Sequence, residues 1–390
     1  MVRSAVSLFS GCGGFDVGFT TRGFRVVEAH DIDPVAIGTY NANHTPVGLV
    51  TDLSKHAIDI PNADIIIAGP PCQGFSTIGS LRGDDARNSL LASACRIIVK
   101  RRPKVAILEN VMGLTTSRNK AVLEAAIAVL SENGYFVETV LIRAEDHGVA
   151  QRRRRILIFA RRGKKPFNVS LPTVTTRTTV FDVLHRLAQP AFSRPKSLPR
   201  NSKARLIAER IGPGQKLCNV RESAAAVHTW DIPEVFGRVS KVEREMLQIL
   251  LRLRRSERKR SFGDADPVSF RRISASFGSG SDAILHSLCE KDYVRRVGAK
   301  FDLAHTFNGT YRRLRWDAPS PTVDTHFGEP RLFLHPDEHR GMSVFEAAAL
   351  QGFDADFEWP KSSTAAFRLI GNAVPPPISR AVASVAGSLM

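Results

Sequence analysis

The chain has 390 residues, of which 43% are hydrophobic, and a formal net charge of +17 at pH 7. This length allows one large domain, or a main domain and a smaller one. The excess of Lys and Arg indicates a polyanionic partner, most simply nucleic acid, with a generally basic surface as the alternative. Five cysteines without a CxxC pair argue against a disulfide framework and a zinc site, so we expect no metal. We also expect a reducing, cytoplasmic compartment, no signal peptide and no membrane span.

Strand and helix signals alternate along the first 160 residues. Short runs rich in Val, Ile and Phe predict strands, and longer runs with apolar residues at helical spacing predict helices. The expected strands are 5–9, 24–29, 64–68, 104–108, 135–141 and 155–160, and the expected helices are 15–22, 34–43, 88–102 and 120–132. This alternation predicts an α/β fold with a parallel, doubly wound sheet. Ligands of such sheets bind at the carboxyl ends of the strands.

The alternation stops after residue 171. Residues 172–305 are rich in Arg, Ser and Pro, which indicates an inserted domain. We therefore predict a catalytic domain over 1–171, a smaller inserted domain over 172–335, and a C-terminal segment over 336–390 that completes the catalytic domain.

Within the insert, three helices and a hairpin are expected in sequence. Their predicted ranges are 241–254, 267–276, 281–290 and 293–303. This order is similar to a winged helix, in which 281–290 would enter a DNA groove. The alternative is a small helical packing unit whose arginines are simply solvated.

A glycine-rich turn, Ser10-Gly11-Cys12-Gly13-Gly14, follows the first predicted strand and opens the first helix. Backbone N–H groups at such a turn can hold an anionic group. Asp31 ends the second strand, where an acidic residue commonly accepts hydrogen bonds from ribose hydroxyls. Asp52-Leu53 adds an acidic and an apolar side chain that could flank an adenine ring. Together these residues predict a nucleoside cofactor.

Cys72 lies in the run Gly69-Pro70-Pro71-Cys72-Gln73-Gly74-Phe75-Ser76, directly after a buried predicted strand. The two prolines fix the backbone, and the flanking glycines let it pass close to a ligand. A thiol presented so rigidly suits a nucleophile, because nucleophilic attack rewards fixed geometry. The alternative is a structural cysteine at the end of a strand.

A carboxyl group and several guanidinium groups are expected at the same sheet edge. Glu109 ends the strand 104–108, and Gln151-Arg152-Arg153-Arg154-Arg155 leads into the last strand. Alternate side chains of a strand share a face, so Gln151, Arg153 and Arg155 are expected to point together. The alternative is a solvated basic loop. With the thiol, these groups suit the activation of a heteroaromatic ring.

These motifs, in this order, resemble the DNA (cytosine-5) methyltransferases of the prokaryotic restriction–modification or orphan type. They are 9–14, 69–76, 109–111, 151–155, 340–351 and 371–376. The variable stretch between them lies where that family keeps its target-recognition region. The resemblance implies a doubly wound S-adenosylmethionine-dependent methyltransferase sheet with a smaller inserted target-recognition domain.

The resemblance also implies a reaction and its residues. A methyl group would pass from S-adenosylmethionine to C5 of a cytosine flipped out of a specific duplex site, through a covalent Cys72–C6 adduct, leaving S-adenosylhomocysteine. The catalytic residues would be Cys72, Glu109, Arg153 and Arg155. The cofactor-binding residues would be Phe9, Ser10, Gly11, Gly13, Gly14, Asp31, Ile32, Asp52, Leu53, Pro71, Leu90, Asn372 and Val374. Ile32 is aliphatic where the family often has an aromatic residue, so we expect weaker cofactor binding.

Residues expected to contact DNA fall in these motifs and in a basic cluster after the helix 241–254. They are Gln73, Ser76, Gln151, Arg254, Arg255, Arg258, Lys259 and Arg260. The expected partner is double-stranded DNA, bound by a monomer in the cytoplasm at the nucleoid. A cognate restriction endonuclease of the same system, without a stable complex, is a further expectation.

Two competing functions remain open from the sequence. The first is a tRNA cytosine-5 methyltransferase, whose characteristic Cys-Phe-Thr run is not matched by Cys218-Asn219-Val220. The second is a DNA-binding protein that kept the fold without catalysis. The presence of Cys72, Glu109, Gln151, Arg153 and Arg155 argues against it.

Overall fold

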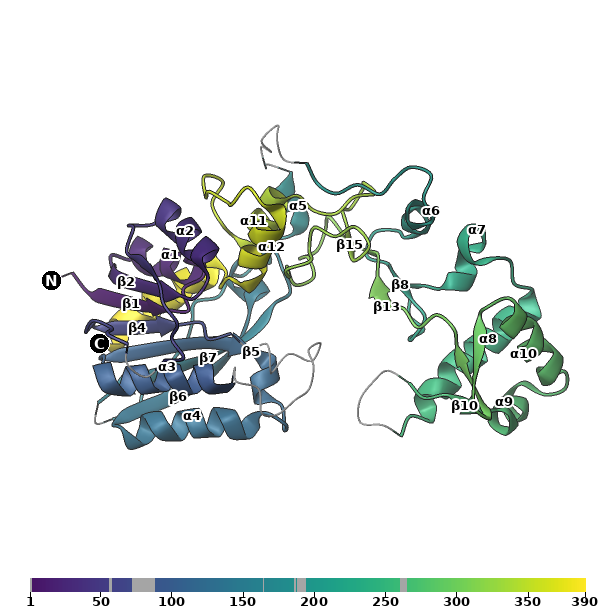
Figure 1. Cartoon of the computed structure of the whole chain (residues 1–390), viewed down its shortest axis with the longest axis horizontal. Coiled ribbons are helices and arrows are strands. Elements are labelled where there is room, and N and C mark those ends of the chain that lie inside the picture. Colours follow the sequence, from purple (N-terminus) through teal and green to yellow (C-terminus); the bar gives the residue numbers. More distant parts are fainter. Residues whose placement is uncertain are drawn as a thin grey trace. The chain divides into compact units, whose positions relative to one another are not determined.

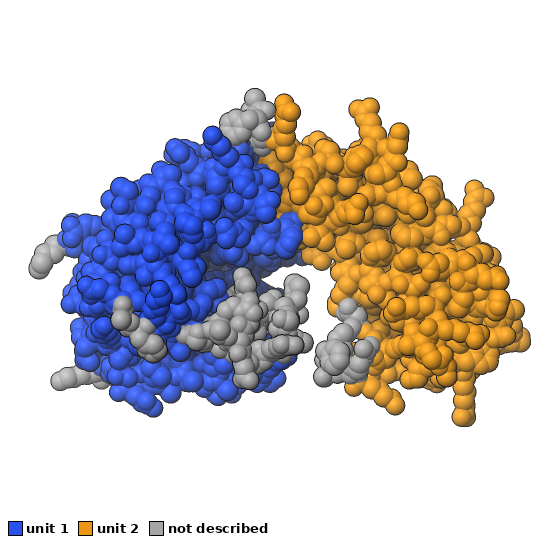
Figure 2. All heavy atoms as spheres, in the orientation of Figure 1, with its two compact units in different colours: residues 1–193, 316–326, 344–390 blue, residues 194–315, 327–343 orange. Residues whose placement is uncertain are grey.

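The structure is a computed structural model, and it describes residues 2–55, 58–71, 88–163, 165–185, 187, 194–259 and 265–390. The chain forms two compact units, which Figure 2 colours separately. Unit 1 comprises residues 1–193, 316–326 and 344–390, and unit 2 comprises residues 194–315 and 327–343. The chain thus leaves unit 1 twice and returns to it twice. The motif 371–376 and residues 344–351 of the motif 340–351 therefore belong to the same unit as the N-terminal motifs.

Unit 1 is built on a seven-stranded sheet with the order β3-β2-β1-β4-β5-β7-β6 (Figure 1). The strands are β1 (Ser4–Leu8), β2 (Arg25–Asp31), β3 (Gly48–Val50), β4 (Ile65–Ala68), β5 (Val105–Val111), β6 (Tyr135–Arg143) and β7 (Arg154–Arg162). Strands β1, β2, β4 and β5 are mutually parallel, so their carboxyl ends meet at one edge. The predicted motif residues follow or end these strands.

Helices cover both faces of this sheet. The helices of unit 1 are α1 (Gly14–Thr21), α2 (Pro34–Asn43), α3 (Asn88–Arg101), α4 (Lys120–Glu132), α5 (Val180–Leu184), α11 (Val344–Gln351), α12 (Ser363–Asn372) and α13 (Pro376–Ala386). One core packs α1 and α13 against Ile65 and Ile67 of β4, and a second packs α3 and α4 against Ile66. The alternation of these isoleucines between two cores is the period of two expected of a strand buried on both faces.

The doubly wound sheet expected from the sequence is present, but it is not parallel throughout, because β7 runs antiparallel to both β5 and β6. A parallel neighbour needs a crossover of a dozen or more residues, usually a helix. The connection from β6 to β7 is short, comprising residues 144–153, and contains only the single 3₁₀ turn Ala144–His147. The chain therefore turns back on itself instead of crossing over.

Unit 2 contains several small sheets and helices. Its elements are α6 (Lys203–Arg210), β8 (Lys216–Cys218), β9 (Ala226–Val227), α7 (Pro233–Phe236), α8 (Lys241–Ser256), β10 (Val268–Ser269), α9 (Phe270–Phe277), α10 (Ser281–Glu290), β11 (Val294–Val297), β12 (Lys300–Leu303), β13 (Asn308–Thr310), β14 (Arg312–Arg313) and β15 (Phe333–Leu334). The short strands and the sheet β13-β8-β9 were not expected from the sequence.

The segment from α8 to β12 has the order of a winged helix. Helices α8, α9 and α10 are followed by the hairpin β11–β12, and β10 joins the hairpin in a sheet of order β10-β12-β11. One apolar core holds these elements together, with Leu247 and Leu250 of α8, Leu285 of α10 and Phe301 of β12. Helix α8 begins with a capping box between Ser240 and Glu243. The similarity to a winged helix expected from the sequence is thus present in the structure.

Candidate active site

The glycine-rich turn after β1 is tied to the end of β2. The N–H of Gly11 donates to Oδ2 of Asp31 at 2.9 Å, and the N–H of Asp33 donates to Oδ1 at 2.9 Å. Burial raises the pKa of Asp31, while these two N–H groups oppose the rise. Gly13, at φ 88, adopts the left-handed backbone from which α1 starts. The turn and the carboxylate therefore form one fixed unit at the sheet edge.

One side chain of this turn fits a polar ligand. Ser10 is 8% exposed, and its Oγ has no hydrogen-bond partner among the described residues. A buried hydroxyl without a partner is costly, and a ligand atom would satisfy it.

At Gly14 a Cβ would lie 2.5 Å from the carbonyl oxygen of Val374 and 3.1 Å from the Cβ of Ala373. Only glycine lets the turn pack this closely against the C-terminal segment.

The predicted adenine-side residues divide into a surface group and a core group. Ile32 is 65% exposed, an unusual state for an isoleucine, and it offers an apolar face. The carboxylate of Asp52 accepts hydrogen bonds from the hydroxyl and the N–H of Ser54, which lower its pKa. Leu53 is buried in the core, with Phe9 packed against the same cluster. Leu53 thus belongs to the core and not to the exposed surface of the site.

The four remaining predicted cofactor residues lie on three separate segments of unit 1. Leu90 is half-buried in α3, and Pro71 is exposed just after β4. Asn372 is exposed at the end of α12, and Val374 is buried two residues later.

Glu109 and Arg155 form the central ion pair of the site. Nε of Arg155 lies 2.7 Å from Oε1 of Glu109, and both side chains are largely buried. The pair spans β5 and β7, which are hydrogen-bonded neighbours. A carboxylate held by a guanidinium at a strand end is fixed in orientation, as recognition of a planar ring requires.

Asn110 connects this pair to the cysteine motif. Its Nδ2 donates to the carbonyl oxygen of Pro70 at 3.3 Å, and its side chain is buried. Sequence reasoning quoted Asn110 only as part of a motif, and its position beside Glu109 was the available signal. The structure assigns it to holding the backbone two residues before Cys72.

Gln151 and Arg153 differ from their expected orientation. Both are buried, at 0% and 1% exposure. Arg153 donates to the carbonyl oxygens of Val323, Gly371 and Ala373 at 3.0–3.2 Å. The strand β7 begins only at Arg154, so the rule that alternate residues share a face does not extend back to these two.

The amide of Gln151 bonds to the side chain of Gln351 and accepts from the N–H of Val323. The positions of Gln151 and Arg153 thus correct the prediction that they, like Arg155, face the substrate. In the described structure they hold protein backbone together. Sequence reasoning missed Gln351 as the partner of Gln151.

The predicted DNA cluster in unit 2 is also divided by burial. Arg254 is 4% exposed and its Nε bonds to the carboxylate of Asp302, which Arg295 also contacts. Its predicted contact with DNA is corrected, because the core and Asp302 occupy its guanidinium. Arg255, Arg258 and Lys259 are exposed, as a DNA contact requires.

Four predicted residues lie outside the described part of the chain. They are Cys72, Gln73, Ser76 and Arg260. Within the described ranges, no group of three or more His, Cys, Asp or Glu side chains is placed to hold a metal ion. Among those same residues, no helix is both long and apolar enough to cross a membrane.

Comparison with known proteins extends this description to the whole chain. The sequence model of the family described as C-5 cytosine-specific DNA methylase matches residues 4–388. Type II methyltransferase M.AgeI of Thalassovita gelatinovora is 30% identical, with 97% of each chain aligned. Type II methyltransferase M.HgiBI of Herpetosiphon aurantiacus is 29% identical over 96% of this chain and 94% of its own.

Solved structures show the same fold. A DNA modification methyltransferase encoded within an E. coli prophage aligns with a TM-score of 0.60 at 22% identity, covering 99% of both chains. The S. pombe Dnmt2 methyltransferase aligns with a TM-score of 0.52 at 16% identity, again over 99% of both chains.

The family expected from the motifs is thereby confirmed, and neither the tRNA hypothesis nor the non-catalytic one is favoured. The glycine turn with Asp31, the Glu109–Arg155 pair and the motif order meet in one unit whose sequence matches that family along nearly its full length. The chain belongs to the C-5 cytosine-specific DNA methylases and is a DNA cytosine-5 methyltransferase.

Proposed function

We propose that this enzyme methylates one specific duplex DNA sequence, and that Cys72 attacks C6 of a cytosine flipped out of that duplex. The observation that carries the proposal is the link between motifs at one sheet edge. Asn110 holds the carbonyl of Pro70, and its neighbour Glu109 is paired with Arg155. The backbone before Cys72 is thus held by Asn110, and the carboxylate that would hold the base belongs to the adjacent residue, Glu109.

S-adenosylmethionine fits the turn after β1. The partnerless Ser10 hydroxyl and the exposed Ile32 supply a polar and an apolar contact, and Asp31 would accept from ribose hydroxyls. When bound, this cofactor supplies a methyl group on an electrophilic sulfonium. The other residues proposed to hold it are Phe9, Gly11, Gly13, Gly14, Asp52, Leu53, Pro71, Leu90, Asn372 and Val374. No metal is part of the proposal.

The residues of the chain prepare the cytosine for this methyl group. The Cys72 thiolate would form a bond to C6 and push the C5–C6 electron pair onto C5, which makes C5 the nucleophile. Glu109 would hold N3 and the exocyclic amino group, and Arg155 would hold Glu109 in place. After methylation, loss of the C5 proton returns an electron pair to the ring and expels Cys72 as thiolate.

The two parts of the chain would divide this work. Residues 1–171 and 336–390 would carry the chemistry, and residues 172–335 would recognise the DNA sequence. Gln73, Ser76, Arg255, Arg258, Lys259 and Arg260 are the proposed DNA contacts. We further propose a monomeric, cytoplasmic enzyme at the nucleoid. The naming of M.AgeI and M.HgiBI as Type II methyltransferases supports a place in a restriction–modification system with a cognate endonuclease.

Cys72→Ser should abolish methyl transfer and leave DNA binding intact, because attack needs a thiolate whereas binding is mostly phosphate contact. We would measure label transfer from S-adenosylmethionine to mixed-sequence duplex DNA and to tRNA, then map the product by conversion sequencing. Label is expected in DNA at one cytosine context.

The matched control is Cys289→Ser, which changes a half-buried thiol of unit 2 and should leave turnover unchanged. Turnover by Cys72→Ser near the wild-type rate would remove Cys72 as the nucleophile. A wild-type protein that labels tRNA and leaves duplex DNA unlabelled would overturn the substrate assignment.

A further inference from the structure

The exposed side of α10 is poorly suited to a DNA groove. Asp282, Ala283, His286 and Glu290 are exposed, and the helix contains no Lys or Arg. Nδ1 of His286 lies 3.4 Å from the Glu290 carboxylate. Because DNA presents a continuous row of phosphates, two exposed carboxylates on this surface would be repelled by the duplex.

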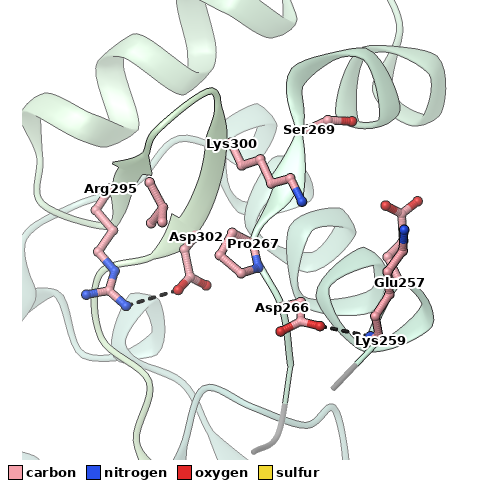
Figure 3. Close-up of a pocket in the computed structure, with 9 residues that line it drawn as sticks. Glu257, Lys259, Asp266, Pro267, Ser269, Arg295, Lys300 and Asp302 are labelled. Carbon is pink, nitrogen blue, oxygen red and sulfur yellow. Dashed lines mark hydrogen bonds and ion pairs between the residues drawn. The ribbon is translucent and has the colours of Figure 1, made fainter. Parts of the chain in front are cut away.

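The sheet β10-β12-β11 offers a different surface. The pairs Ser269–Lys300, Val297–Lys300 and Arg295–Asp302 place one side chain of each pair beside the other on the same face. Val268 and Phe301 point instead into the core of the unit. The face with Lys300 lines a cavity of about 680 Å³, shown in Figure 3, together with Glu257 and Lys259 from the end of α8. We call this surface the open sheet face.

Acidic groups of the open sheet face are already engaged within the protein. The Asp302 carboxylate contacts both Arg254 and Arg295, and the Glu257 carboxylate lies 2.6 Å from Nε of Arg272. The carboxylate of Asp266 accepts the backbone N–H of Lys259 at 2.8 Å, as drawn in Figure 3. The negative charges of Asp302 and Glu257 are therefore offset by arginines of the same unit, and the Asp266 carboxylate is held by the backbone.

Two ammonium groups of this face remain available. Lys259 and Lys300 are exposed, and neither side chain has an ion pair or hydrogen bond in the described structure. Exposed Arg296 lies on the same hairpin, and exposed Arg271 begins the neighbouring helix α9. The positive charge thus gathers around the hairpin and the end of α8, while α10 carries the opposite sign.

The hairpin β11–β12 has a shape suited to a groove of DNA. It closes over Gly298 and Ala299, with Gly298 at φ 59, and exposed Val297 precedes the turn. A tight turn of small residues keeps the tip narrow. The major groove of B-DNA admits a two-stranded ribbon as well as a helix.

We propose that unit 2 meets duplex DNA through the open sheet face and the hairpin β11–β12, with Lys259 and Lys300 against phosphates, and not through α10. This inference rests on the proposed function, since it assigns a surface for the DNA substrate. The partner is duplex DNA because its regular phosphate rows complement ammonium groups spread over two elements.

The test compares two matched pairs of glutamine substitutions. The first variant is Lys259→Gln with Lys300→Gln, and the second is Ala283→Gln with His286→Gln on α10. Affinity for a fluorescent duplex is measured by anisotropy over a range of salt concentrations. Each lost phosphate contact lowers the slope of log affinity against log salt by about 0.9, so the first variant should lose about 2 from the slope. The second variant should bind like wild type.

Rescue separates charge from folding. Lys259→Arg with Lys300→Arg should restore the wild-type slope, because a guanidinium also contacts phosphate. An unchanged slope in the glutamine variant would overturn the proposal, as would a tenfold loss of affinity in the α10 variant or tighter binding of tRNA than of duplex DNA. Methyl transfer by wild type is scored separately, so failure of the proposed reaction would not be mistaken for failure of this surface.

Discussion

Arg153 and Gln351 converge on one oxygen atom, the carbonyl of Ala373. Arg153 reaches it at 3.2 Å and Gln351 at 2.8 Å, and they also hold the carbonyls of Gly371 and Ile370 respectively. These hydrogen bonds fix the backbone of the turn between α12 and α13. Because Asn372 and Val374, two of the residues proposed to bind the cofactor, belong to this turn, we interpret Arg153 as a positioning residue for the proposed cofactor site.

Arg153→Lys should weaken binding of S-adenosylmethionine by tenfold or more. Arg153 reaches its three carbonyls from two separate nitrogens of a planar guanidinium, and the compact ammonium of lysine does not reproduce that geometry. Hydrogen bonds to charged groups contribute about 1.5–3 kcal/mol each. Equilibrium dialysis with labelled cofactor measures the effect. Arg152→Lys, at an exposed neighbouring position, is the control and should bind normally. Unchanged cofactor affinity in Arg153→Lys would show that the turn does not depend on the guanidinium group of Arg153.

Asp16 is a second residue whose role becomes clear only from its contacts in the folded protein. It is fully buried, with the Ser7 hydroxyl donating at 2.9 Å and the Tyr40 hydroxyl at 3.1 Å. Burial raises its pKa from 3.8 to about 7, and the two hydroxyls limit the rise. The folded state therefore keeps a proton on Asp16 over a range of pH in which the unfolded chain releases it.

This raised pKa predicts how stability varies with pH. Between about pH 4 and pH 7 the folded state binds the extra proton, so the contribution of Asp16 to the free energy of unfolding falls as pH rises through this window. Asp16→Asn removes that proton equilibrium, so its stability relative to wild type should increase from pH 4 to pH 7 and then level off. Urea titrations at several pH values measure the difference. Asp356→Asn, at an exposed position, should show no such trend.

At the scale of elements, the glycine content of α1 follows from its packing against α13. A Cβ at Gly18 would overlap the main chain of Ser379 and Arg380. The hydroxyl of Ser379 accepts the N–H of Gly18 at 3.0 Å and donates to the carbonyl of Phe15. The C-terminal helix is therefore joined to the first helix through a contact that tolerates no side chain. This contact supports the glycine turn from which α1 begins.

Gly18→Ala should destabilise the protein by about 1–3 kcal/mol through overpacking, although alanine favours helix. Gly38→Ala provides a matched control within α2, because a Cβ there would meet nothing within 4 Å. That substitution should stabilise the protein by about 0.5–1 kcal/mol. Thermal unfolding of the two variants should thus shift in opposite directions. A stabilised Gly18→Ala protein would mean that α1 and α13 are not closely packed in solution.

Across the whole molecule, charge and chemistry fall in different parts of the chain. Most of the excess of Lys and Arg lies within unit 2, whereas the glycine turn, Asp31, Glu109 and Arg155 lie in unit 1. A basic unit that lacks these motif residues suits binding to a polyanion. This division explains why net charge indicated the partner while motifs indicated the reaction.

The sequence by itself determined the family, most elements and the residues at the carboxyl edge of the sheet. Helices α2, α4 and α10 have their predicted bounds, and Glu109 lies where its motif placed it. These features depend on local patterns of apolar residues and on short motifs, and such patterns are contained within a few turns or strands of chain.

The tertiary structure decided which polar side chains face outward. Arg153, Gln151 and Arg254 look like surface cations and amides in the sequence, yet their partners are Ala373, Gln351 and Asp302, between 48 and 220 residues away. The position of β7 between β5 and β6 was likewise set by pairing across the sheet. Burial and strand direction depend on contacts between distant segments, and no local pattern encodes those contacts.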